Sequence, residues 1–512
     1  MLKTNNGSPY TDSRPTRKSA SGDRSPARLR ILFDNARSSD DIRTVYVLTR
    51  VGFLLFLGVL VLIGITFAVS SENRIASNNA AYAEISAESL ARDNLRGSIY
   101  DRNGVLLAQT VRNEDGTKSR NYQFIESFAH ILGRQPGASF GNNGVEVYYN
   151  ESLVGVRNAN IKALRGDDLH LSIDAQLQNY IYSVFSSFTG GAVVSDCRTG
   201  EVLAMVSTPS YDFTLPAETA KEKYNNGEYV NNCMAPLTPG SVFKLLTACV
   251  LTDNNCLPVL ENDRASHTFA GVGTISNAGK TAFVNVDICR AIEVSSNVWF
   301  SRAAWQLCNG DNAFSANTYI NGIENLGMGV SFPTQLGRIT QRHAITADAK
   351  WELLQSSFGQ GALEISPLYM NIFVSALATD GQMRTPTFVS KTVNPKGKTV
   401  EETEPTELGY RISEEARATV LQGMKQAADS YKLYWNGQAS SVYAKTGTAE
   451  ITETRNNKWL TCAFPASSPR YTLTLVSIEG LGMSSALYEP ARQILDFLAQ
   501  QEAQAAAQQS QK

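Results

Sequence analysis

The sequence is poor in the residues that build metal and redox sites. It has four histidines, and none belongs to an H-E-x-x-H motif or lies beside a cysteine pair at zinc-ligand spacing. The seven cysteines include no C-x-x-C pair, and their odd number leaves at least one outside any intramolecular disulfide. We therefore expect no metal and no cofactor, and we expect most cysteines to be small core residues.

Phosphate-binding signatures and an excess of positive charge are also missing. There is no P-loop and no G-x-G-x-x-G, and 46 Lys and Arg oppose 48 Asp and Glu, for a net charge of −2. Because nucleic-acid binding needs clustered Lys and Arg, we expect no nucleic-acid partner. The 512 residues are 43% hydrophobic, which excludes a largely disordered protein and predicts two to four folded units.

One long run without charge is present, over residues 51–70. Its length matches the roughly 20 residues with which a helix crosses a bilayer. A buried core helix rarely stays uncharged on every face, and a signal peptide has a shorter apolar stretch without about 50 residues before it. We therefore predict one transmembrane anchor over 45–70. Lys and Arg are in excess before the run, which predicts a cytoplasmic N-terminus and an extracytoplasmic remainder.

The rest of the chain divides by composition. Residues 1–44 are charged and poor in apolar side chains, which predicts a disordered cytoplasmic tail. Residues 71–168 read as a smaller β-rich module, in which Asn103-Gly104 predicts a type I′ hairpin turn. Residues 169–498 alternate strand-like and helical patterns and predict a larger mixed α/β domain. The Ala- and Gln-rich residues 499–512 form a low-complexity tail.

The strongest chemical signal is the segment Pro-Gly-Ser-Val-Phe-Lys at 239–244. Residues 242–251 are apolar on nearly every face, which predicts a buried helix with Ser241 at its start. Lys244 follows one turn later, and burial lowers the pKa of a lysine enough for it to act as the base that a serine nucleophile needs. The alternative is an ordinary N-cap serine beside a lysine that reaches solvent.

Two weaker signals follow the serine. Lys445, Thr446, Gly447 and Thr448 continue a strand-like stretch, and a glycine inside a strand suggests that the backbone of a ligand approaches closely. The lysine and threonines could then hold a carboxylate, although a turn at a sheet edge also explains the pattern. The third signal, Ser295-Ser296-Asn297, follows a helical pattern and gains meaning only from its order and spacing.

In combination, the three motifs resemble those of class B, monofunctional penicillin-binding proteins. The resemblance covers nearly everything after residue 45 and includes further landmarks: Asp174 to Gln178, Thr199 to Met205, Pro209 to Asp212, Gly359 to Gly361, and Ser366 to Leu368. Arg96 to Ala108 resembles the N-terminal module of the family. One departure is Trp459-Leu460-Thr461-Cys462, where the family often has Trp-Phe and a small residue, so we expect different local packing.

The resemblance implies a mixed α/β fold of the serine β-lactamase type, with an antiparallel sheet flanked by helices, above a β-rich pedestal or dimerisation-like module. It implies a D,D-transpeptidase that crosslinks peptidoglycan stem peptides ending in D-Ala-D-Ala, that β-lactams inhibit, and that works beside a membrane glycan polymerase. The roles that it implies are nucleophile, base, proton relay and lysine positioning for Ser241, Lys244, Ser295 and Asn297, and carboxylate binding for Lys445, Thr446, Gly447 and Thr448.

Other functions share these residues. A β-lactamase or membrane β-lactam sensor would use the same acylation chemistry, but no E-x-x-L-N supplies a deacylating glutamate. A D,D-carboxypeptidase would hydrolyse the acyl-enzyme instead of transferring it. A non-catalytic scaffold for a glycan polymerase is a further alternative, against which the three intact motifs argue.

Overall fold

The computed structural model describes residues 43, 46–63, 66, 90, 94–136, 143–156, 165–225, 227–309, 313–480 and 482–510. The chain divides into two units, residues 1–82 and 83–512. In the first, the helix Tyr46–Ile63 is apolar enough to cross a membrane, with a mean hydropathy of 2.4, and none of its residues is buried. It lies within the predicted anchor. The predicted tail falls outside the described residues, apart from residue 43.

A five-stranded antiparallel sheet forms the centre of the second unit. Its strand order is β19 (Tyr443–Glu450), β20 (Asn456–Phe464), β21 (Tyr471–Gly480), β5 (Gly190–Asp196) and β6 (Val202–Thr208). All residues of β6 and nearly all of β5 are buried, as expected for strands that are covered on both faces. β19 is an edge strand, so one of its sides has no partner strand in this sheet.

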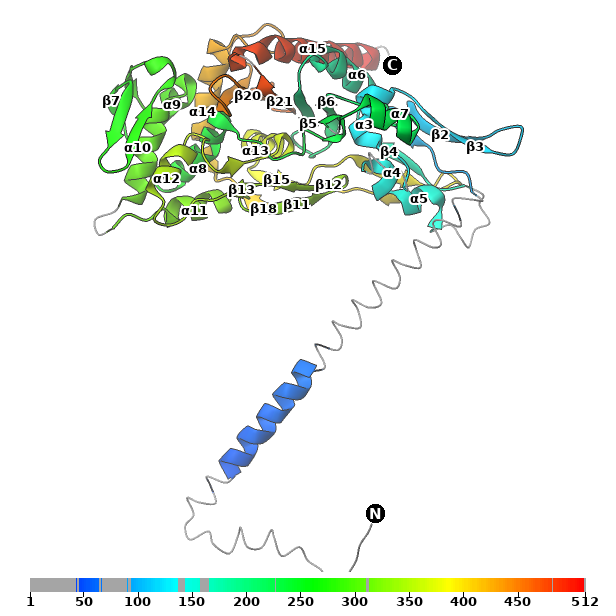
Figure 1. Ribbon diagram of the computed structural model, residues 1–512, viewed down its shortest axis with the longest axis horizontal. Coiled ribbons are helices and arrows are strands. Elements are labelled where there is room, and N and C mark those ends of the chain that lie inside the picture. The colour runs from blue at the N-terminus through cyan, green and yellow to red at the C-terminus, as the bar shows by residue number, and fades with distance from the viewer. Residues whose placement is uncertain are drawn as a thin grey trace, which may run out of the picture. The chain divides into compact units, whose positions relative to one another are not determined.

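Helices cover both faces of this sheet. α6 (Ala175–Phe185) and α15 (Tyr488–Ser510) lie on one face, and α13 (Pro367–Ala378) and α8 (Lys244–Asp253) lie on the other (Figure 1). Alternate strand residues enter the two cores: Val194 and Leu473 pack with α6 and α15, while Val193 and Val476 pack with α13. The mixed α/β fold with an antiparallel sheet between helices is therefore confirmed.

A mainly helical region follows α8 in the chain. Its helices are α9 (Ile288–Val294), α10 (Asn297–Cys308), α11 (Asn317–Glu324), α12 (Lys350–Ser356) and α14 (Glu414–Ser430). Five two-stranded ribbons accompany them: β7 (Leu260–Asp263) with β10 (Phe283–Val286), β8 (Ser266–Phe269) with β9 (Gly273–Ser276), β11 (Ser331–Thr334) with β12 (Gly337–Thr340), β13 (Arg342–His343) with β14 (Leu363–Glu364), and β15 (Gln382–Arg384) with β18 (Glu407–Arg411).

A second sheet joins the N-terminal module to the larger domain. Its order is β17 (Thr399–Glu402), β16 (Val389–Val393), β4 (Asp168–Leu171), β1 (Ile99–Tyr100), β2 (Leu106–Arg112) and β3 (Lys118–Tyr122). The helices of this region are α3 (Ile125–Leu132), α4 (Val145–Tyr148), α5 (Asn150–Val154) and α7 (Ala217–Lys223). The expected division between residues 168 and 169 remains a prediction, and strands from both sides of it share this sheet.

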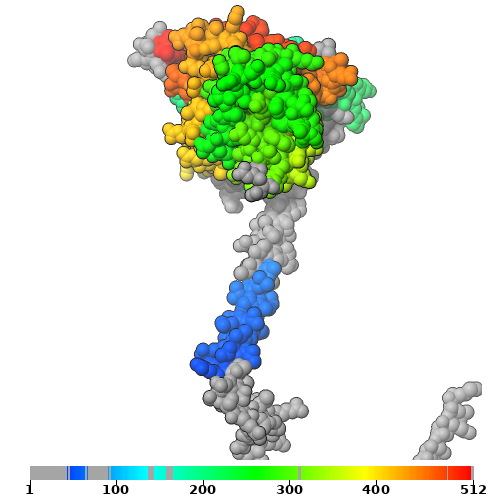
Figure 2. Space-filling view, turned by 90° about the vertical axis from the view of Figure 1, so that its left-hand side faces the viewer, coloured from blue at the N-terminus to red at the C-terminus, as the bar shows by residue number. Residues whose placement is uncertain are grey.

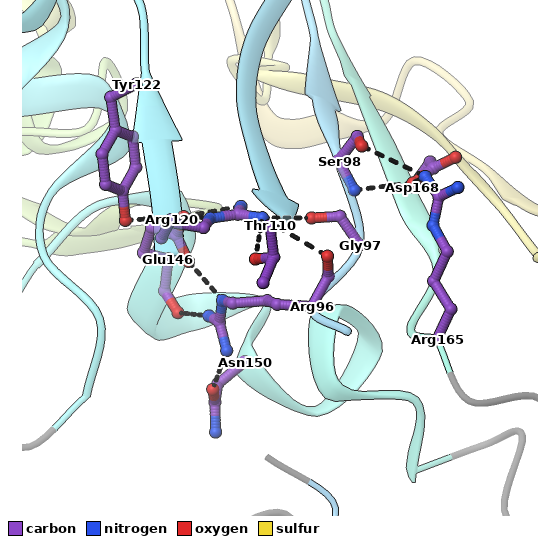
Figure 3. A network of polar contacts seen from close by, with 10 residues as sticks. All are labelled: Arg96, Gly97, Ser98, Thr110, Arg120, Tyr122, Glu146, Asn150, Arg165 and Asp168. Carbon is purple, nitrogen blue, oxygen red and sulfur yellow. Dashed lines mark hydrogen bonds and ion pairs between the residues drawn. The ribbon is translucent and has the colours of Figure 1, made fainter. Parts of the chain in front are cut away.

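A buried ion cluster holds the module together (Figure 3). The Glu146 side chain is fully buried and accepts hydrogen bonds from Arg96 Nε at 2.5 Å and from Arg120 Nε at 2.9 Å. Tyr122 donates to the same carboxylate at 3.1 Å. Arg120 also donates to the Gly97 carbonyl at 2.6 Å. The network therefore ties α4 to β3 and to the segment that leads into β1.

The predicted hairpin is present, but the prediction of a type I′ turn is wrong. β1 and β2 pair antiparallel, yet only Gly104 of the predicted pair has a positive φ, of 83°. A type I′ turn needs a positive φ at both central residues. The Asp101 carboxylate instead accepts from the N–H groups of Asn103 and Val105, at 2.8 and 2.7 Å, and this local bonding sets a longer loop.

The Ala- and Gln-rich C-terminal segment continues α15 as far as Ser510. Ala and Gln are good helix formers, so low sequence complexity does not oppose a helix. Glu502 lies in this segment and accepts hydrogen bonds from Arg470 and Tyr471, at 2.8 and 2.9 Å. The segment is thus joined to the start of β21 by polar contacts.

Candidate active site

Ser241 lies in a single 3₁₀ turn, Gly240–Phe243, that leads directly into α8. Gly240 has a φ of 57°, and a Cβ added there would lie 2.7 Å from the carbonyl oxygen of Thr448. A Cβ added at Gly359 would lie 1.8 Å from the carbonyl oxygen of Gly240. The turn that carries the serine is therefore held between β19 and the loop after α12, where only glycine fits.

Lys244 is the first residue of α8 and is fully buried. Its Nζ lies 3.0 Å from Ser241 Oγ, as the one-turn spacing predicts. The same nitrogen lies 2.6 Å from the Ser295 carbonyl oxygen and 2.7 Å from Asn297 Oδ1. Two of the predicted motifs therefore meet at one amine.

The helix junction around Ser296 explains how Ser295 and Asn297 reach Lys244. Ser295 ends α9 with a left-handed backbone, at φ 58°, and Ser296 caps α10 by accepting from Trp299 N at 2.9 Å. The chain reverses between the two helices, so that the Ser295 hydroxyl lies 3.1 Å from Lys244 Nζ. Asn297 is fixed from its other end, because its amide donates to the Ser276 carbonyl at 3.0 Å.

β19 brings the third motif to the same place. Lys445 is fully buried, and its Nζ lies 3.0 Å from Ser295 Oγ, so the Ser295 hydroxyl lies between two lysines. Thr446 donates to the Tyr431 hydroxyl at 3.1 Å. Thr446 and Thr448 point to the same side of the strand and line the cavity described below.

A contact within the protein also requires a glycine at 447, and the expected approach of a ligand backbone stays a prediction. A Cβ there would lie 2.8 Å from the carbonyl oxygen of Pro239 and 3.0 Å from the backbone nitrogen of Val242. The turn that carries Ser241 therefore approaches the strand closely at this glycine. Trp459 of β20 supports the same turn by donating to the Thr238 carbonyl at 2.9 Å.

The charge states of the two lysines follow from burial. Desolvation holds the pKa of Lys244 well below 10.5, and the nearby charge of Lys445 lowers it further, whereas Asp263 opposes both effects. Desolvation also lowers the pKa of Lys445, to about 7. A lowered pKa favours the uncharged form of Lys244, which is the state that a general base requires.

Hydrogen-bond counting then assigns the lone pair of Lys244. A neutral amine has two N–H groups, and the Ser295 carbonyl and the Asn297 amide oxygen can only accept. In the neutral form both N–H groups are therefore used, and the lone pair can accept the proton of a hydroxyl, either that of Ser241 or that of Ser295 at 3.1 Å. Ser241 Oγ, at 3.0 Å, is in position to supply that proton.

A cavity of 970 Å³ opens in front of these side chains. One wall comes from the Ser241 turn and from the helical region, including Asn297 and Trp351, and the other comes from β19, including Thr446 and Thr448. In Figure 2, the green surface of the helical region borders the orange surface of the C-terminal part of the unit. The volume suits a peptide-sized ligand that reaches Ser241 from solvent.

The structure thus brings together all eight residues that the sequence analysis selected. Sequence reasoning missed Asp263 and Tyr431, which contact the motifs from behind, and Asn277, which lines the cavity. No motif marks any of the three. Gly359 was noted as a landmark without a role, and its role is to allow close contact with Gly240.

No group of three His, Cys, Asp or Glu side chains in the described parts of the chain could hold a metal ion. All seven cysteines are free and buried. The described site therefore consists of serine, lysine, asparagine and threonine side chains.

The family model and two similar proteins point to the same protein family. The family model for the penicillin binding protein transpeptidase domain matches residues 190–495. Penicillin-binding protein 3 of Bacillus subtilis (strain 168) is 24% identical over 394 residues, which cover 66% of this chain and 55% of that protein. The peptidoglycan D,D-transpeptidase MrdA of Haemophilus influenzae is 24% identical over 466 residues, which cover 74% of this chain and 69% of that protein.

Solved structures show the same fold. The D,D-transpeptidase domain of a peptidoglycan glycosyltransferase from Eggerthella lenta superposes with a TM-score of 0.70 at 24% identity, covering 80% of this chain and 99% of that one. The ceftriaxone acyl-enzyme of penicillin-binding protein A from M. tuberculosis gives a TM-score of 0.68 at 19% identity, covering 80% and 98%. Since the family model matches more than half of its residues, this chain belongs to the penicillin-binding protein transpeptidase family.

Proposed function

We propose that this chain is a peptidoglycan D,D-transpeptidase that crosslinks stem peptides ending in D-Ala-D-Ala. The observation that carries the proposal is the contact of 3.0 Å between Ser241 Oγ and the buried amine of Lys244. The names of the relatives, and the acyl-enzyme formed by one of the structures of the same fold, support it.

In the acylation step, Ser241 Oγ attacks the carbonyl carbon of the penultimate D-Ala while its proton passes to Lys244 Nζ. The C–O bond forms, the carbonyl becomes an oxyanion, and the backbone N–H groups of Ser241 and Thr448 stabilise it. Each such donor typically contributes about 10²- to 10³-fold in rate. The C–N bond then breaks as the leaving amine receives a proton through Ser295, which contacts both lysines.

Substrate binding is assigned to β19. Lys445, Thr446 and Thr448 would hold the terminal carboxylate of the donor peptide, and Asn297 would fix its amide. The amine of a neighbouring stem peptide then attacks the ester carbonyl and gives a proton to Lys244. The ester C–O bond breaks as Lys244 returns that proton to Ser241 Oγ, which restores the free serine. A β-lactam would enter by the same route and leave a stable ester on Ser241.

The test is intact-mass analysis after incubation with a penicillin. We expect a persistent adduct on Ser241 that is absent from Ser241→Ala, and a normal adduct on the control Ser467→Ala, which changes an exposed serine far along the chain. Absence of an adduct on the folded wild-type protein would refute the serine mechanism. Product analysis with an added acceptor amine then separates transfer from hydrolysis, since a D,D-carboxypeptidase would give only the shortened peptide.

We further infer that the helix Tyr46–Ile63 anchors the chain with its N-terminus in the cytoplasm and its catalytic unit outside. The excess of Lys and Arg before the run supports this orientation. A membrane glycan polymerase would supply the strands that such an anchored enzyme crosslinks. Co-purification of the full chain with a polymerase from membranes would test that partnership, and a Ser241→Ala chain that supports growth would favour a scaffold instead.

A further inference from the structure

Asp263 is a buried carboxylate behind the turn that carries Ser295 and Asn297. It ends β7 and has no exposed surface. Its Oδ2 accepts hydrogen bonds from the Ser296 hydroxyl and, at 3.3 Å, from the Asn277 amide. Its Oδ1 is buried without a hydrogen-bond partner. A buried and incompletely paired carboxylate is costly, so its presence here calls for a reason.

The first consequence of Asp263 is mechanical. Ser296 lies between Ser295 and Asn297, the two residues that hold Lys244. Ser295 has a left-handed backbone, which a residue other than glycine adopts only when its surroundings fix it. The bond from Ser296 to Asp263 provides this fixation from behind. Asn277 adds to it, because its Oδ1 accepts from Val298 N at 3.0 Å.

The second consequence is electrostatic. Two ionisable groups act on Lys244: the cation of Lys445, from β19, and the anion of Asp263, from β7. α10 contributes an uncharged ring, since Phe300 lies with its centre 5.7 Å from Lys244 Nζ, and α9 contributes the neutral Ser295. Among these neighbours of Lys244, Asp263 is the group that carries a negative charge. It also acts on His267 of β8, where Arg264 and Arg302 oppose it.

These two observations meet in the acylation step. Lys244 begins as a neutral amine and becomes an ammonium ion when it takes the Ser241 proton. Burial and Lys445 both disfavour that ion, whereas a nearby buried anion favours it. We propose that Asp263 is a positioning residue of acylation, which holds the Ser295–Asn297 turn through Ser296 and stabilises the ammonium form of Lys244 by its charge. This inference rests on the proposed function of Ser241 and Lys244.

The test is the pH dependence of acylation by a fluorescent penicillin, measured on the full chain in detergent. The second-order rate constant should rise on the acid side as Lys244 loses its proton. In Asp263→Asn the shape is kept but the charge is lost, so the Lys244 ammonium is less favoured. We expect the acid limb to move to lower pH by about half to one unit. We also expect the maximal rate to fall roughly tenfold, because the base is weaker.

Two control variants separate charge from support. Ser296→Ala keeps the charge and removes the link, so it should slow acylation while the acid limb stays in place. Glu261→Gln removes an exposed charge from the same strand and should change neither quantity. An unmoved acid limb in Asp263→Asn would overturn the electrostatic role. If the charge of Asp263 acts on Lys244, its removal must lower the pKa of Lys244 and move that limb.

Folding failure is covered by a second variant. If Asp263→Asn does not fold, the smaller neutral Asp263→Ser takes its place, and if neither folds, a normal acylation rate in Ser296→Ala overturns the proposal. Failure of the proposed function gives a different result, because the wild-type chain would then form no adduct at all.

Discussion

At the scale of single residues, Lys445 is a buried lysine whose charge changes near neutral pH. Burial lowers its pKa to about 7, so the free enzyme loses the Lys445 charge as the pH rises through that value. If the charged form binds the carboxylate of the ligand, the acylation rate constant for a penicillin should decline above pH 7. Stopped-flow measurement of that constant from pH 5.5 to 9.5 gives the profile.

A matched pair of variants identifies the source of this decline. Lys445→Gln should lower the rate constant and remove the alkaline limb, because no charge is left to lose. Lys425→Gln, which changes an exposed lysine on α14, should preserve both. A limb that persists unchanged in Lys445→Gln would assign it to another group.

The residues that carry chemistry could be predicted because each belongs to a short local pattern. Ser241 and Lys244 are one helical turn apart, and that spacing alone places their side chains together. Asp263 and Tyr431 could not be found in this way. Asp263 ends β7, 33 residues before its partner Ser296, and Tyr431 follows the last residue of α14, 15 residues before its partner Thr446. Hydrophobic periodicity does not predict contacts of this kind.

At the scale of elements, the position of the nucleophile depends on glycines that allow backbone segments to touch. Gly359, at φ 88°, contacts the Gly240 carbonyl, whereas Gly397, at φ 79°, faces open space in the turn between β16 and β17. Alanine at either position carries the left-handed backbone cost of about 1–2 kcal/mol. Only Gly359→Ala should also displace the Ser241 turn and slow acylation, by about 10²-fold.

Thermal unfolding and acylation rates of the two variants provide the measurement. We expect Gly397→Ala to lose a little stability and to acylate normally. If both variants acylate at the wild-type rate, the close contact at Gly240 has no part in holding the serine.

Secondary structure was predictable where one face or both faces are apolar, as in α8, β5 and β6. The turn between β1 and β2 was not, because the Asp101 carboxylate competes with the backbone preference of Asn-Gly. The helical state of residues 499–510 was also missed, since composition was judged instead of the helix propensity of Ala and Gln. Both differences are local and lie far from Ser241 in the chain.

At the scale of the molecule, the shared six-stranded sheet connects the N-terminal module to the larger domain. Strand pairing between distant segments could not be derived from the sequence, because β16 and β4 are separated by more than two hundred residues. A consequence is that damage inside the module should reach the whole unit. Glu146 is the place to test this, since its carboxylate holds two buried arginines.

Glu146→Gln should lower the free energy of unfolding by about 3–5 kcal/mol, because it leaves Arg96 and Arg120 buried without a counter-ion. Residues 83–512 should still unfold in a single transition, as followed by calorimetry. The control Glu151→Gln changes an exposed carboxylate in α5 and should leave stability unchanged. Two separate transitions in the wild-type protein would show that the module and the domain unfold independently.

Acid should have a related effect on the wild-type protein. Burial by itself would raise the pKa of Glu146, but Arg120 and Arg96 outweigh it and hold the pKa below its ordinary value of 4.5. The unfolded state therefore binds the proton first as the pH falls, and the contribution of Glu146 to stability is lost below about pH 4.5. In Glu146→Gln, this part of the acid dependence should be absent.

The burial of all seven thiols makes the native chain a clean background for site-directed labelling. Desolvation raises the pKa of the buried Cys462 and Cys233 thiols, and maleimides react with exposed thiolates. In each variant, a single cysteine introduced on one side of the hydrophobic helix would then be the thiol of this chain that the maleimide labels. In intact cells, a maleimide that does not cross membranes should label a cysteine placed on the C-terminal side of the helix and should not label one on the N-terminal side. Because the native thiols are buried, this labelling reports the membrane topology of the chain.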